Sequence, residues 1–143
     1  MSHVAKLDIE LKDLDAIRAA VKRIGGIWKE GQKRYAWYGR HVGDYPLPEG
    51  FTASDLGKCD HAFGFDGASY EIGVVRKADG SYAILWDFYS PGGLLPHMGG
   101  ETADKFKQAY AIEKAKIEAR KKGMIVREKT LPNGAVQLSI GKL

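Results

Sequence analysis

The stretch Ser69–Tyr89, SYEIGVVRKADGSYAILWDFY, carries the strongest hairpin signal in the chain. Two runs rich in β-branched and aromatic residues flank Asp79-Gly80, a dipeptide that favours the tight turns of β-hairpins. The register that follows from a two-residue turn consists of three pairs: Val75 with Ile84, Gly73 with Trp86, and Ile72 with Asp87. The sequence therefore predicts an antiparallel hairpin at the centre of the fold.

This register gives the hairpin two apolar faces. One face carries Tyr82, Ile84, Trp86, Phe88 and Val75, and the other carries Ile72, Val74, Leu85, Asp87 and the pair Tyr70 and Tyr89. Because apolar surface on both sides of a sheet needs cover, we expect helices on one face and loops or a partner on the other.

The order strand, helix, strand, strand occurs at both ends of the chain, and the second of these halves begins with the strand in SYAILWDFY (81–89). Alternation over Val4–Leu11 predicts a strand, Asp13 can cap a helix, and Gly25 or Gly26 can end it. The apolar stripe of that helix is Leu14, Ile17, Val21 and Ile24. The segments IWKE (27–30) and KRYAWYG (33–39) then suggest a hairpin.

The C-terminal part is expected to contain a helix from about Thr102 to Lys122. Gly123 caps this helix, and MIVREK (124–129) and AVQLSI (135–140) flank the turn LPNG (131–134). We therefore predict a single α+β domain over residues 1–143. It has an antiparallel sheet with two main helices on one face, built from two pseudo-repeated β-α-β-β halves around the central hairpin.

Composition narrows the class of protein. The chain has 143 residues, a net charge of +4 and a pI near 9.1, which permits a nucleic-acid partner without requiring one. Cys59 is the single cysteine, so no internal disulfide can form. With no secretory signal and no apolar run of membrane-spanning length, the sequence predicts a soluble cytoplasmic protein.

The proline- and glycine-containing segment 44–60 is expected to be a long connection within the domain.

The stretch QKRYAWYGRH (32–41) is a candidate binding surface. It interleaves basic and aromatic side chains, as single-stranded nucleic-acid platforms do: Lys33, Arg34, Arg40 and His41 with Tyr35, Trp37 and Tyr38. On a strand, however, Tyr35 and Trp37 would point away from the arginines. The pattern favours rings in the core and solvated arginines, and leaves open whether Tyr38 is a lone exposed ring or a stacking contact.

A second candidate is the loop SPGGLLPHMGGET (90–102). Gly99 and Gly100 precede the expected C-terminal helix, where backbone N–H groups and the helix dipole could hold an anion. No phosphate-loop or dinucleotide motif is present, so tight turns and mobility are the favoured interpretation. The loop is also a natural place for a lid or a partner contact.

The residues that could carry chemistry are scattered. Cys59 and His61 could form a thiol–imidazole pair, but the cysteine and histidine spacings predict no metal site and no cofactor. Asp87, in an apolar strand, is the best candidate for a perturbed pKa, and Glu113 lies within the stripe of the C-terminal helix. Both acids are more simply explained as hydrogen-bonded structural carboxylates.

Several segments together resemble one family almost from end to end. They are the opening MSH, DLDAIRAAVKRIG (13–25), CDHAFGFDGASYEIGVVRKADGSYAILWDFYSPGG (59–93), KFKQAYA (105–111) and KKGMIVREKTLPNGAVQLSI (121–140). The family is that of hypothetical chloroplast reading frame thirty-five, found in cyanobacteria, plastids, other bacteria and tailed phages, and this chain is more similar to its bacterial and phage branch. The resemblance is weakest over Lys33–Leu56. It implies no activity, cofactor or catalytic residue, but genes for AAA-type ATPases near such relatives imply a partner or adaptor role.

Three functional hypotheses follow. The first is a non-catalytic binding or adaptor module that presents a sheet face or the Pro91–Gly100 loop to a protein partner, such as an AAA-type ATPase or another host factor. The second is a nucleic-acid or nucleotide-binding module that uses residues 32–41 and the basic end of the C-terminal helix. The third is an enzyme that uses Asp87, Glu113, Cys59 or His61.

Overall fold

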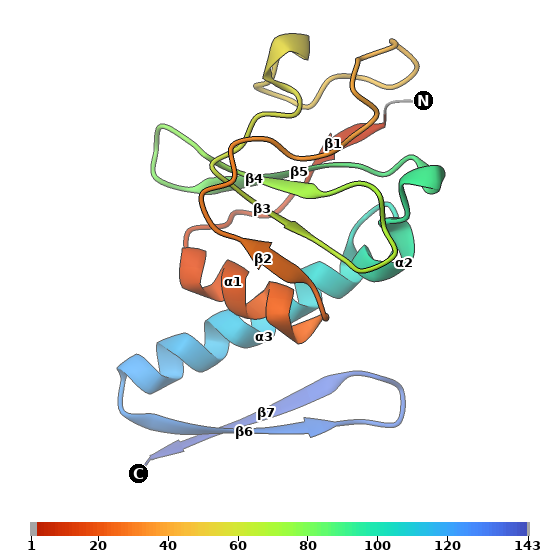
Figure 1. The fold of residues 1–143 in the computed structure, drawn as a ribbon. Coiled ribbons are helices and arrows are strands. Elements are labelled where there is room, and N and C mark those ends of the chain that lie inside the picture. Colours follow the sequence, from red (N-terminus) through yellow and green to blue (C-terminus); the bar gives the residue numbers. More distant parts are fainter. Residues whose placement is uncertain (1–2, 143) are drawn as a thin grey trace.

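The computed structural model describes residues 3–142 and confirms the α+β class (Figure 1). A five-stranded antiparallel sheet has the order β1-β5-β4-β3-β2, and β6 and β7 form a separate two-stranded sheet. The strands are β1 (Val4–Lys6), β2 (Ile27–Lys29), β3 (His61–Gly64), β4 (Ile72–Arg76), β5 (Tyr82–Asp87), β6 (Met124–Thr130) and β7 (Val136–Lys142). The helices are α1 (Leu14–Arg23), α2 (Leu95–Met98) and α3 (Asp104–Lys121).

The central hairpin is present, but its predicted register is wrong by one residue. Val74 pairs with Ile84 and Ile72 with Trp86. The connection contains three residues instead of two, because Gly80 takes a positive φ of 85° and donates to the Lys77 carbonyl, as in a turn that ends in a glycine bulge. A slip of one residue exchanges the faces of one strand relative to the other, so Ile72 and Val74 share a face with Ile84 and Trp86.

This face packs against helices, as expected. Ile17 and Val21 of α1 and Phe106 and Tyr110 of α3 join it in the larger hydrophobic core. The Asp13 carboxylate accepts from the Ala16 N–H at 3.1 Å, so the predicted cap of α1 is confirmed. Figure 1 shows both helices on the same side of the sheet.

The opposite face is covered by the chain itself. Residues 32–60, which we call the crossing segment, run over it and build a second core. The buried members of this core are Val4, Tyr35, Leu56, Cys59, Ala62 and Leu85. In Figure 1 the segment lies on the side of the sheet away from α1 and α3. The expectation that loops or a partner cover this face is met by a loop.

The predicted hairpin of residues 27–39 is wrong. β2 pairs with β3, Ile27 lying opposite Gly64, and residues 33–39 form no strand. Within this stretch, Arg34 forms an isolated antiparallel β-bridge with Lys58. Aromatic and β-branched residues predicted a strand here, but long-range contacts with the sheet decided its path.

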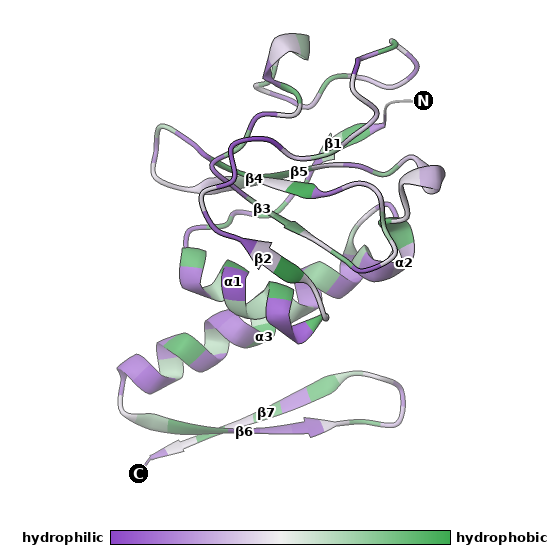
Figure 2. Ribbon diagram, viewed as in Figure 1, coloured by the Kyte–Doolittle hydropathy of each residue, from purple (hydrophilic) through white to green (hydrophobic). Residues whose placement is uncertain are grey.

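The two halves of the chain also differ in where their last strands lie. β1, α1 and β2 belong to the main sheet and its helix layer, whereas β6 and β7, which we call the ribbon, lie on the far side of α3 (Figure 1). None of residues 122–142 is buried. Figure 2 shows that the ribbon carries both polar and apolar residues.

Four charged side chains attach the ribbon to both long helices. Arg23 of α1 donates two hydrogen bonds to the Glu128 carboxylate of β6, at 2.9 and 2.8 Å. Lys116 of α3 donates to the same carboxylate at 2.6 Å, and Glu113 accepts from Arg23 at 2.9 Å. The hydrogen bonds from Arg23 and Lys116 lower the pKa of Glu128 to about 2. A bidentate, charge-assisted cluster therefore fixes the ribbon against the helices.

Glu128→Gln should destabilise the protein at neutral pH but hardly at acid pH. The folded pKa of Glu128 is about 2 against a usual 4.5, so its contribution is complete above pH 4.5 and is lost as pH falls towards 2. We expect a loss of about 1–2 kcal/mol at pH 7, as for charge-assisted hydrogen bonds at a partly exposed site. Urea unfolding followed by far-UV circular dichroism at pH 7, 4 and 2.5 measures the difference.

Glu118→Gln is the matched control, because Glu118 forms its ion pair with Lys114 within α3 and not with the ribbon. Its effect should be smaller at every pH. A Glu128→Gln variant that is equally destabilised at pH 7 and pH 2.5 would contradict the role given to this carboxylate.

Candidate functional site

The rings of the candidate stretch 32–41 are used in folding. Tyr35 is buried against the sheet, where a methyl group at Gly73 would overlap its ring. Burial raises the pKa of Tyr35 to about 12. Trp37 lies against Gly57, and Tyr38 contacts the Tyr89 ring edge-on at 5.9 Å. The interpretation in which Tyr35 and Trp37 join the core is therefore confirmed, and Tyr38 is a half-buried packing residue.

The basic residues of the same stretch do not form one surface with the rings. Lys33, Arg34 and Arg40 are exposed, and His41 is half-buried. Two acidic side chains hold the backbone between them, since Glu71 accepts from the Ala36 N–H and Asp87 from the Tyr38 N–H. Because Tyr35, Trp37 and Tyr38 pack against other residues, their rings are not open for bases to stack on.

Asp87 is a structural anchor. Its side chain is fully buried, and its two oxygens accept three backbone N–H groups, those of His3 at 2.9 Å, Tyr89 at 3.1 Å and Tyr38 at 3.1 Å. These donors belong to the N-terminal segment, the end of β5 and the crossing segment. A buried carboxylate is tolerated when it is satisfied in this way.

Glu71 is a second anchor of the crossing segment. One carboxylate oxygen accepts from the Ala36 N–H and from the Gln32 amide, and the other accepts from Lys29. Burial alone would raise the pKa of Glu71, but the hydrogen bonds from Lys29 and Ala36 keep it below its usual value. The prediction from sequence did not single out this residue, because nothing local distinguishes it from a solvated strand-end acid.

Cys59 and His61 do not form a catalytic pair. The Cys59 thiol donates to the Gln32 carbonyl at 3.2 Å, and burial raises its pKa to about 11. The Nδ1 of His61 accepts from the Gly31 N–H at 2.9 Å, and its ring packs 5.4 Å from that of Trp28. A buried, high-pKa thiol of this kind is inert.

Gly99 and Gly100 do not form an anion site. Both of their N–H groups donate to the Leu95 carbonyl, at 3.0 and 2.9 Å, and so close the short helix α2. Leu94 and Met98 of the same loop are buried in the larger core. The loop is therefore a packed connection, and the predicted mobility has no counterpart in its contacts.

Glu113 also has a structural role. It accepts from Arg23 at 2.9 Å and lies 3.4 Å from Lys116, within the cluster that holds the ribbon. Across residues 3–142, no group of three His, Cys, Asp or Glu side chains is arranged to hold a metal ion. In the same part of the chain, no helix is both long and apolar enough to cross a membrane.

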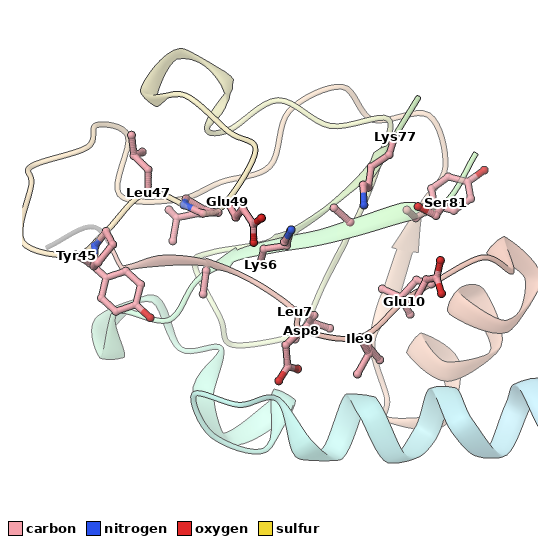
Figure 3. Close-up of a pocket in the computed structure, with 17 residues that line it drawn as sticks. Lys6, Leu7, Asp8, Ile9, Glu10, Tyr45, Leu47, Glu49, Lys77 and Ser81 are labelled. Atoms are coloured by element: carbon pink, nitrogen blue, oxygen red, sulfur yellow. The ribbon is translucent and has the colours of Figure 1, made fainter. Parts of the chain in front are cut away.

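A groove of about 710 Å³ lies along β1, the edge strand of the main sheet. Residues 4–11 form one wall, residues 45–49 of the crossing segment form the other, and Lys77 and residues 81–83 lie at one end. Figure 3 shows Tyr45 and Leu47 on the crossing-segment side, Lys6 and Glu49 in the middle, and Lys77 near Ser81 at the end of the hairpin. We call this feature the β1 groove.

The β1 groove combines apolar and charged side chains. Tyr45 and Leu47 are among the few large hydrophobic residues that are exposed, at 37% and 39%. Lys6, Lys77 and Glu49 supply both signs of charge. The prolines of DYPLPEG (44–50) indicate a loop at this wall. The sequence alone could not show that this loop lies beside the first strand.

Comparison with family models, curated proteins and solved structures finds no match to this chain. The resemblance to the reading-frame family stays a prediction.

Gly73→Ala should destabilise the fold because its methyl group would overlap the Tyr35 ring. Overpacking of this kind costs about 1–3 kcal/mol of unfolding free energy. Gly64→Ala is the matched control, since its methyl group would have no neighbour nearer than 3.6 Å. Urea unfolding of both variants measures the difference, and Tyr35→Leu in the Gly73→Ala background should recover part of the loss. Equal stability of the two alanine variants would contradict the packing described for Tyr35.

Proposed function

We propose that the protein is a non-catalytic cytoplasmic binding module that receives an extended segment of a protein partner along the β1 groove. The observation that carries this proposal is the position of the groove on the free edge of the sheet. An edge strand presents unpaired backbone groups, and adding a strand from a partner is a common mode of peptide recognition.

The ladder of β1 supports this geometry. The His3 carbonyl accepts from the Phe88 N–H and the Leu7 N–H donates to the Ile84 carbonyl, both at 3.0 Å. Odd-numbered residues therefore pair with β5. Since hydrogen-bonding directions alternate along an antiparallel strand, the N–H and C=O groups of Val4 and Lys6 point out of the sheet, towards the groove.

The walls of the groove favour particular side chains in the partner. Alternate residues of an added strand point to the same side, so one set would face Tyr45 and Leu47. Those positions suit apolar side chains. The other groove residues, including Lys6, Glu49 and Lys77, suit polar or charged side chains. Backbone pairing supplies affinity in this mode, and the alternating contacts supply selectivity.

The other surfaces considered for a partner are less accessible. The crossing segment covers the second face of the sheet, and the Pro91–Gly100 loop packs into the core. We propose an AAA-type ATPase or another host factor as the source of the added strand, on the basis of the gene neighbourhood that the resemblance implies.

A non-catalytic role is supported by the residues that were considered for catalysis. Asp87 and Glu113 hold backbone or ion-pair partners, and Cys59 and His61 each bond to the backbone instead of to each other. Each of the four therefore has a structural use.

Lys6→Pro should abolish peptide binding while leaving the fold intact. Proline removes the outward N–H of residue 6 and keeps the ladder to β5, a substitution that edge strands tolerate. Lys6→Ala is the control, because it removes the side chain and keeps the N–H. Octapeptides selected on the wild-type protein from a random display library should bind Lys6→Ala with less than a threefold change and lose at least tenfold on Lys6→Pro.

NMR amide shifts should place the bound peptide at residues 4–7 and 45–49. Selected peptides that bind both variants equally, or that shift amides elsewhere, would contradict the site. Failure to select any peptide would contradict the function.

A further inference from the structure

The positive charge of the chain is concentrated at its C-terminal end. Residues 120–142 hold six basic side chains and one acidic one, a net charge of +5. All other residues together hold sixteen basic and seventeen acidic side chains, a net charge of −1. The modest overall value of +4 therefore hides a nearly neutral body that carries a strongly basic end.

The single acid in this region is paired with basic side chains of the two helices. Glu128 faces α1 and α3, where Arg23 and Lys116 bind it. The residues on the opposite face of the ribbon, its outer face, are Ile125, Arg127, Lys129, Gln137, Ser139 and Gly141. Arg127 lies opposite Ser139, and Lys129 lies opposite Gln137. The outer face thus presents two cations and two neutral hydrogen-bonding residues, with no acid among them.

The basic residues of this end are available to a ligand. They are Arg120, Lys121, Lys122, Arg127, Lys129 and Lys142, all of them exposed. Within residues 3–142 none of the six makes an ion pair. An ordered array of unpaired cations favours a polyanionic partner.

The composition of the ribbon indicates which polyanion. Residues 120–142 contain no Phe, Tyr or Trp, so no ring is available for stacking on the bases of a single strand. Protein interfaces are enriched in aromatic residues and depleted in lysine, the opposite of this surface. The major groove of A-form RNA is too deep and narrow for side chains to read, whereas that of B-form DNA admits a two-stranded β-ribbon.

We propose that the outer face of the ribbon enters the major groove of double-stranded DNA. Arg127, Lys129 and Gln137 then face base edges, where arginine and lysine pair with guanine and glutamine with adenine. The other basic side chains lie at the ends of the ribbon and of α3, where they can neutralise phosphates. A strand of seven residues extends about 24 Å, which lies within one turn of the duplex.

This site is separate from the β1 groove. Figure 1 shows the ribbon beyond α3, on the side of the helices away from the sheet. The cluster at Glu128 holds the ribbon on both helices and leaves its outer face uncovered. A chain with both sites would connect a protein partner to DNA.

The test is fluorescence anisotropy of a labelled 20-base-pair duplex with the full chain at 50 and 200 mM NaCl. We expect the wild type to bind and to weaken steeply with salt, because counterions are released from the phosphates. Arg127→Gln/Lys129→Gln should bind at least tenfold more weakly and show a salt slope reduced by about two. Ser139→Glu, which adds an acid to the same face, should also weaken binding at least fivefold.

Lys33→Gln/Arg34→Gln is the matched control. It removes the same charge from exposed positions in the crossing segment and should change affinity less than twofold. Far-UV circular dichroism confirms that every variant is folded. An equal loss in the control, no binding at 50 mM NaCl, tighter binding to a single strand or to duplex RNA, or equal competition by poly-L-glutamate would each overturn the proposal. The last result would indicate an acidic protein as the partner.

Discussion

The buried carboxylate of Asp87 connects three segments of the chain that lie far apart in the sequence. Its three N–H donors come from His3, Tyr38 and Tyr89, so a single side chain fixes the entry of β1, the exit of β5 and the crossing segment. Removal of one acceptor would leave buried N–H groups unsatisfied, at a cost of about 1–3 kcal/mol each. The second core under Tyr35 and the wall at residues 45–49 both depend on that path, and so does the β1 groove.

The predictable parts of the fold are those set by local chemistry. Asp13, the apolar stripe after it and the glycines at 25 and 26 define α1 within about a dozen residues, and the structure has that helix. The hairpin register failed because Asp79-Gly80 fits both a two-residue turn and a three-residue turn with a glycine bulge. Residues 33–39 failed for a different reason. Their strand-like pattern is overridden by distant partners, Glu71 and Gly73, whose positions no local window contains.

The candidate sites follow the same division. Sequence correctly favoured a core role for Tyr35 and Trp37, although the strand alternation on which that prediction rested is not formed. It could not find the β1 groove, which needs two segments about forty residues apart to meet. The basic end, residues 120–142, could have been found from the sequence, because counting the charges of each segment separately reveals it. An average over the whole chain conceals it, because the body is close to neutral.

The lack of aromatic residues in the segment 120–142 also affects which spectroscopic signals can follow the protein. The three tryptophans, at positions 28, 37 and 86, lie on β2, on the crossing segment and on β5, and every tyrosine also precedes residue 120. Intrinsic fluorescence and near-ultraviolet absorbance therefore report on the body alone. A ribbon that detached from α1 and α3 would be silent in both signals, so a thermal melt followed by tryptophan emission would describe a protein without its basic end.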